Sequence, residues 1–166
     1  MARRSPEEYR MMHEREDVIH YRFRKIGYLA DAMCVDDISE KTGVNKEYSN
    51  GSMGTLGDVV LKLMISEGLF AEGKSRSEIT EAKQLMESNE TFHGVVERLG
   101  IHRFAFNDSY FFEEAPEEKQ LPHSRHDGYL EAIVAAVYLD AGYNGCRKWF
   151  KDFLLPVINA EVDRQK

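Results

Sequence analysis

Two acidic side chains stand where the neighbouring residues predict burial, so they are the first candidates for chemistry. Asp58 lies within a strongly apolar stretch, and Glu131 is flanked by Leu130 and Ala132. A buried carboxylate is costly unless it is paired, hydrogen-bonded or bound to a metal. Asp127 precedes Glu131 by four residues, so both would project from one face of a helix. If the two segments pack together, these acids form an all-oxygen site that suits hard divalent cations such as Mg²⁺ or Mn²⁺.

Each acid also has an ordinary structural explanation. Asp58 is followed four residues later by Lys62, a spacing typical of an ion pair on a helix. Lys119 or Arg125 could neutralise Glu131, since both precede its segment. Taken singly, the acids are therefore as compatible with structural ion pairs as with a reactive site.

The apolar periodicity predicts an all-α fold and places each acid on a long helix. Residues 56–70 are apolar on all sides, which predicts the buried central helix of the domain. Residues 127–140 carry a wide apolar face and end before Gly142. No alternating pattern of useful strand length occurs. Further helical segments are predicted at 6–19, from 23 to about 42, at 77–86, at 88–99 and from 144 to about 162.

Two stretches are predicted to be irregular. Residues 45–54 are polar and rich in glycine, and we interpret Gly51 and Gly54 as part of a turn. Residues 101–122 contain a run of aromatic side chains, which would pack into the core or stack on unpaired bases.

Composition narrows the class of protein. A chain of 166 residues with 42% hydrophobic and 31% charged residues is an ordinary globular mixture, and no apolar run is long enough to span a membrane. Two cysteines without metal-site spacing, and a start that lacks a signal peptide, favour the cytoplasm. A net charge of −7 argues against nucleic-acid binding by overall charge alone, so any such binding needs a local basic patch, metal ions or a partner.

One basic group lies just ahead of the second acidic helix. Lys119, His123, Arg125 and His126 are the best candidates in the chain to contact a phosphate backbone near the acids. Exposed charge that serves solubility explains them equally well. The two histidines with Asp127 could also form a transition-metal cluster or a His-Asp dyad, but histidine partners at convincing spacing are missing.

Several short motifs, in the right order, resemble the ribonuclease III catalytic domain. Residues 55–61 read Thr-Leu-Gly-Asp-Val-Val-Leu and are similar to the end of the family signature, where a Leu-Gly-Asp step opens the central helix. Residues 130–142 read Leu-Glu-Ala-Ile-Val-Ala-Ala-Val-Tyr-Leu-Asp-Ala-Gly and resemble the second family motif. Weaker matches are found at 88–91, 97–100 and 19–23. The resemblance runs from about residue 15 to residue 158.

The chain departs from the family pattern at several positions. Gly51 and Gly54 stand where the signature has glutamates, the second of which is a metal ligand in standard members. Gly128 replaces an aspartate that normally precedes the motif glutamate by three residues, and Asp127 is a candidate substitute for it. Thr55 replaces a phenylalanine that inserts into the partner subunit. The compact Mini-III branch, which lacks a double-stranded-RNA-binding domain, shows a similar loss of two acids.

The resemblance implies a single ribonuclease III-like domain over residues 1–166, without a double-stranded-RNA-binding domain. It implies a metal-dependent endoribonuclease that cleaves double-stranded RNA in RNA processing and works as a homodimer. Asp58 and Glu131 would be catalytic and would hold Mg²⁺, with Mn²⁺ as a substitute and Asp127 as a further ligand. The alternative, motivated by the two missing acids, is an inactive relative kept as an RNA-binding or dimerisation module, for instance on the ribosome.

Overall fold

The computed structural model describes residues 6–33, 49–104 and 127–166. These residues form helices joined by short connections and contain no strand, which confirms the predicted all-α fold. Within these ranges, no helix has both the length and the apolar character needed to span a bilayer. The elements, in chain order, are α1 (Pro6–Ile19), α2 (Gly27–Met33), α4 (Asn50–Ala71), α5 (Arg76–Met86), α6 (Asn89–Leu99), the 3₁₀ turn η1 (Ile101–Phe104), α7 (Asp127–Trp149), the π-helical turn η4 (Phe150–Leu154) and α8 (Leu155–Arg164).

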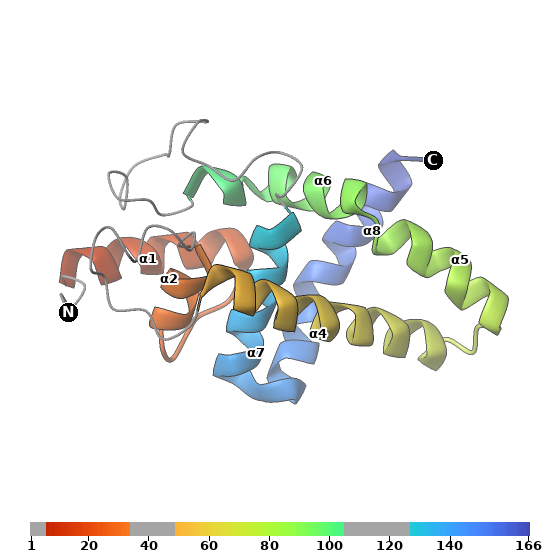
Figure 1. Ribbon diagram of the computed structural model, residues 1–166, viewed down its shortest axis with the longest axis horizontal. Coiled ribbons are helices and arrows are strands. Elements are labelled where there is room, and N and C mark those ends of the chain that lie inside the picture. The colour runs from red at the N-terminus through yellow and green to blue at the C-terminus, as the bar shows by residue number, and fades with distance from the viewer. Residues whose placement is uncertain (1–5, 34–48, 105–126) are drawn as a thin grey trace.

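Helices α4 and α7 cross at the centre of the molecule, with α7 behind α4 in Figure 1. Their backbones touch at Gly57, where an added methyl carbon would lie 1.6 Å from the carbonyl oxygen of Glu131 and 3.1 Å from the amide nitrogen of Ala135. Only glycine permits so close an approach. Because Asp58 follows Gly57 directly, this contact brings Asp58 next to the helix that carries Glu131. Leu61 and Ile65 of α4 and Ile133 and Val137 of α7 are all buried in the core of the fold.

Local capping chemistry sets most helix ends, as the sequence predicts. Ser88 accepts a hydrogen bond of 3.1 Å from the backbone amide of Thr91 at the start of α6. Gly100 ends that helix in the left-handed conformation, with a φ of 70°. Gly142, with a φ of 73°, interrupts α7 where the sequence predicts an end. The predicted helix caps at these three residues are therefore confirmed.

The start of α4 differs from the prediction. Residues 45–54 were predicted to be a loop, yet α4 begins at Asn50, so Gly51 and Gly54 are helical and the predicted turn is wrong. The amide nitrogen Nδ2 of Asn50 donates a hydrogen bond of 2.5 Å to the carbonyl oxygen of Ala32 in α2. A contact across 18 residues thus stabilises a helical turn that its glycines do not favour by themselves.

Helix α4 is also not buried on all sides, contrary to the prediction for residues 56–70. Val59 is 62% exposed and Phe70 is 77% exposed. The spacing of the exposed residues places them on one face of the helix. We call this face the apolar stripe of α4, and it consists of Leu56, Val59, Leu63 and Phe70.

The last acid of the second motif has a structural role. Asp140 accepts hydrogen bonds from the hydroxyl of Tyr21 at 2.7 Å and from the backbone amides of Arg24 at 3.0 Å and Lys25 at 2.9 Å. Burial, together with this hydrogen bond and the Asp140 charge, raises the pKa of Tyr21. Asp140 therefore ties the segment between α1 and α2 to α7, away from the two candidate acids.

Candidate active site

Asp58 is paired with Lys62 on the next turn of α4. The ammonium Nζ of Lys62 lies 3.0 Å from Oδ1 of Asp58 and 3.2 Å from Oδ2. The side chains are 32% exposed for Asp58 and 43% exposed for Lys62, so the pair is accessible to solvent. The hydrogen bond with Asp58 raises the pKa of Lys62, and the negative charges of Asp58, Glu87 and Glu131 add to the effect. The ordinary explanation for Asp58 is thus present in the structure.

Glu131 has a different environment on α7. Burial is the largest cause that raises the pKa of its carboxyl group, and the negative charges of Asp58 and Asp127 raise it further, to about 7. Lys62 opposes this shift in part. Mutual repulsion of this kind requires the carboxylates to lie near one another. The three acids predicted from the sequence therefore share one region at the crossing of α4 and α7.

Lys119 and Arg125, which were proposed to neutralise Glu131, lie outside the described residues. The same holds for the other two members of the predicted RNA-binding group, His123 and His126.

A histidine from α6 borders the acids. The ring nitrogen Nε2 of His93 lies 3.4 Å from Oδ1 of Asp127, the first residue of α7. The sequence analysis missed His93, because no spacing relates the two residues along the chain. The only local signal is its place beside buried Phe92 on an amphipathic helix, which does not indicate a partner on α7.

Gly54, which replaces a family glutamate, lies next to both Glu131 and Gly128. A methyl carbon added at Gly54 would lie 3.9 Å from Oε2 of Glu131 and 3.9 Å from the carbonyl oxygen of Gly128. Both distances are ordinary van der Waals contacts, so a methyl carbon fits at position 54. A longer side chain that starts there would begin next to Glu131.

The donor chemistry of the site fits a divalent cation. The three carboxylates offer only oxygen ligands, and a cation would relieve the repulsion that raises the pKa of Glu131. Within the part of the chain that the structure describes, no three His, Cys, Asp or Glu side chains are already arranged around one point as a metal centre. Asp58 already pairs with Lys62, so a bound ion would share or replace that ammonium partner.

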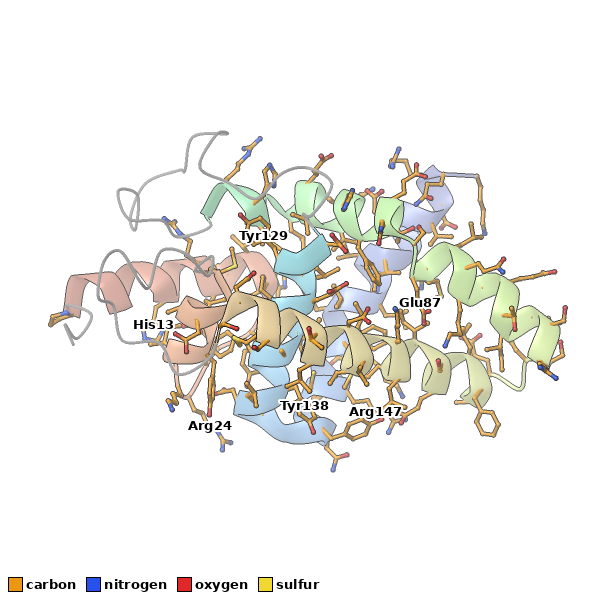
Figure 2. All side chains as sticks on the ribbon, viewed as in Figure 1. His13, Arg24, Glu87, Tyr129, Tyr138 and Arg147 are labelled. Atoms are coloured by element: carbon orange, nitrogen blue, oxygen red, sulfur yellow. The ribbon has the colours of Figure 1, made fainter. Side chains whose placement is uncertain are left out.

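A groove between α4 and α5 opens next to these acids. Its volume is about 550 Å³. Lys62 belongs to both places, because it lines the groove and pairs with Asp58. Figure 2 shows Glu87, just after α5, on the side that faces α4. The residues that line the groove are Lys62, Ile79, Thr80, Lys83, Gln84, Glu87 and Ser88.

An all-α fold with carboxylates gathered where two helices cross defines the class of this chain, and comparison with known proteins gives the family. The family model of the ribonuclease III domain matches residues 52–142, more than half of the 166 residues. The chain therefore belongs to the ribonuclease III family, as the motifs predict, and its domain is of the endoribonuclease type that defines that family. Members of this family generally use divalent metal ions.

Curated relatives and solved structures agree with this assignment. Ribonuclease 3 of Pseudothermotoga lettingae is 28% identical over 162 residues, which cover 95% of this chain and 67% of that protein. Ribonuclease 3 of Clostridium kluyveri is 28% identical over 134 residues, which cover 73% of this chain and 52% of that protein. The chain thus spans between about half and two thirds of the length of these relatives.

The fold matches two solved structures of the nuclease domain of ribonuclease III from Campylobacter jejuni. The TM-scores are 0.68 and 0.65, and both are 20% identical in sequence. The alignments cover 90% and 95% of this chain and 97% and 95% of those chains. The first of these structures was described for structural flexibility in a region involved in dimer formation of that domain.

Proposed function

We propose that this protein is a metal-dependent endoribonuclease that cleaves double-stranded RNA and works as a homodimer. The observation that carries the proposal is the gathering of Asp58, Glu131 and Asp127 at the crossing of α4 and α7, where their charges raise the pKa of Glu131. The backbone contact at Gly57 builds this arrangement into the core of the fold.

Asp58 and Glu131 are the proposed catalytic residues, and their carboxylate oxygens would hold Mg²⁺ or Mn²⁺. A bound divalent ion of this kind activates water for attack and stabilises negative charge on the scissile phosphate. Glu131 must be ionised to serve as a ligand, so it releases its proton as the site loads. Asp127 is the proposed third ligand, and His93 keeps its carboxylate on the side of α6.

The apolar stripe of α4 supports the homodimer. Leu56, Val59 and Leu63 follow one another at intervals of three and four residues, and Thr55 is exposed beside them. Exposed apolar side chains in a continuous row are typical of a surface that another chain covers. A second copy packed on the same face would bury both stripes and place two acid sites on one assembly.

Double-stranded RNA is the substrate that suits such a pair of sites, because A-form RNA is recognised by shape and backbone. Lys119, His123, Arg125 and His126 remain the proposed contacts to the RNA backbone. Since the chain carries a net charge of −7, we expect weak, strongly salt-dependent affinity for RNA.

Cleavage of a long RNA duplex in the presence of Mg²⁺ or Mn²⁺ tests the proposal. We expect the wild-type protein to cut the duplex, and Asp58→Asn and Glu131→Gln to lose at least about a hundredfold in rate. Asp152→Asn is the matched control, because Asp152 is an exposed acid paired with Lys148 on another part of the surface. Equal rates in all four proteins would contradict the roles of Asp58 and Glu131.

A catalytically inactive RNA-binding or dimerisation module is the second candidate. The ion pair that occupies Asp58 and the glycines at positions 54 and 128 favour it. Duplex binding without cleavage, at every concentration of Mg²⁺ and Mn²⁺, would establish this alternative.

A further inference from the structure

Lys62 holds an unusual position between the acid site and the groove. Its ammonium lies within 3.2 Å of both carboxylate oxygens of Asp58. It also interacts with the charge of Glu131 on α7. The positive charge of Lys62 thus pairs with one proposed metal ligand, Asp58, and interacts with a second, Glu131.

We propose that Lys62 is an internal counter-cation that competes with the divalent ion for Asp58 and thereby sets the metal concentration at which the site loads. The inference rests on the proposed function, since it assumes that Asp58 and Glu131 bind a metal ion. Lys62 is then a positioning residue, because it acts through Asp58 and not on the substrate.

Glu87 offers the displaced ammonium of Lys62 an alternative acceptor. Glu87 faces the same groove and contributes to the charge around Lys62. Its oxygen Oε1 is buried and, among the described residues, accepts no hydrogen bond, although the ammonium of Lys83 lies 3.4 Å away. When a divalent ion takes Asp58, the Lys62 side chain can turn along the groove toward this acceptor.

The ion pair between Lys62 and Asp58 is weak enough for a divalent ion to displace it and strong enough to lower the affinity for that ion. Both partners are about one-third exposed or more, so solvent screens their attraction. Removing the positive charge eliminates both the competition for Asp58 and the repulsion of the incoming cation. We expect Lys62→Met to bind Mn²⁺ roughly threefold to tenfold more tightly than the wild type.

The experiment measures Mn²⁺ binding by calorimetry and by electron paramagnetic resonance at neutral pH, with circular dichroism to verify folding. Lys62→Arg keeps the charge and the reach, so it should bind Mn²⁺ as the wild type does. Lys148→Met is the matched control, because Lys148 is an exposed lysine that pairs with Asp152 and does not line the groove. Its affinity for Mn²⁺ should stay within about twofold of the wild-type value.

The outcomes separate this inference from the proposed function. Tighter binding in Lys62→Met alone supports the inference, and so does Mn²⁺ binding that appears only in that variant. Unchanged affinity in Lys62→Met, or equal tightening in Lys148→Met or Lys62→Arg, overturns it. In that case Asp58→Asn and Glu131→Gln test the metal site separately. If these two variants lose Mn²⁺ binding, the proposed function stands although the inference about Lys62 fails. Absence of Mn²⁺ binding in the wild type and all Lys62 variants would overturn both.

Discussion

Replacing Glu131 by glutamine should stabilise the metal-free protein at alkaline pH, although it removes a proposed catalytic group. Burial and the charges of Asp58 and Asp127 raise the pKa of Glu131 from 4.5 to about 7. An acid with a raised pKa in the folded state binds its proton more tightly there than in the unfolded chain. The wild-type fold therefore loses stability as the pH rises from 4.5 through about 7, whereas glutamine stays neutral at every pH.

The size of the effect follows from the same pKa. A rise from 4.5 to about 7 corresponds to a ceiling of about 3.4 kcal/mol in the free energy of unfolding. Because Glu131 is only partly buried, solvent screening reduces this ceiling, and we expect about 1 to 2 kcal/mol. The glutamine variant should match the wild type near pH 4.5 and exceed it by the full amount above about pH 8.

Urea denaturation across this pH range, with a chelator present, measures the difference directly. Millimolar Mg²⁺ or Mn²⁺ at alkaline pH should then stabilise the wild type more than Glu131→Gln and narrow the gap. Glu78→Gln is a control with the opposite sign. Hydrogen bonding with Ser75, whose backbone amide donates to the Glu78 carboxylate, lowers the pKa of Glu78, so Glu78 stabilises the fold above its ordinary pKa and loses that effect on acidification. A stability difference between Glu131→Gln and the wild type that does not change with pH would refute the reasoning about the acid cluster.

Three further substitutions test the fold and the surfaces around the site. Gly57→Ala forces a methyl group into the backbone of α7, so we expect a loss of about 3 kcal/mol or more by denaturant unfolding, whereas Gly68→Ala, with no atom within 4 Å, should be neutral or stabilising by up to about 1 kcal/mol. Gly54→Glu should fold normally and tighten Mn²⁺ binding roughly tenfold by calorimetry, since it adds a carboxylate beside Glu131; unchanged affinity would contradict this. Val59→Lys should shift the protein from dimer to monomer in sedimentation velocity, while Leu85→Lys, on an exposed residue outside the stripe, should not.

Local chemistry explains why much of the fold was predictable from the sequence. The cap at Ser88 and the left-handed Gly100 act within a few residues, and both appear in the structure as the pattern indicates. The start of α4 was not predictable in this way, because the bond from Asn50 to Ala32 joins residues 18 positions apart, which no local pattern indicates. The exposed face of α4 was missed for a related reason: an apolar helix surface looks the same in sequence whether its own domain or another chain covers it.

The candidate site also combines features that the local sequence indicates with features that only tertiary packing creates. Asp58 and Glu131 are conspicuous because carboxylates are rare in apolar stretches, and Lys62 follows from helical spacing alone. The sequence could not reveal that the pair with Lys62 and the approach to Glu131 exist together. It also could not indicate His93, which meets Asp127 only through the packing of α6 against α7.

The contact at Gly57 links stability and chemistry in this fold. The approach of α4 to α7 that forms the apolar core also buries Glu131 and brings Asp58 and Asp127 near it, and burial together with these two charges raises the pKa of Glu131 to about 7. Lys62 relieves part of the repulsion between these acids, since its positive charge pairs with Asp58 and also lowers the pKa of Glu131. A divalent ion held by these carboxylates would offset the remaining repulsion and so would stabilise the folded protein. Metal binding should therefore raise the free energy of unfolding most at pH values above 7, where the ionised acids repel one another in full.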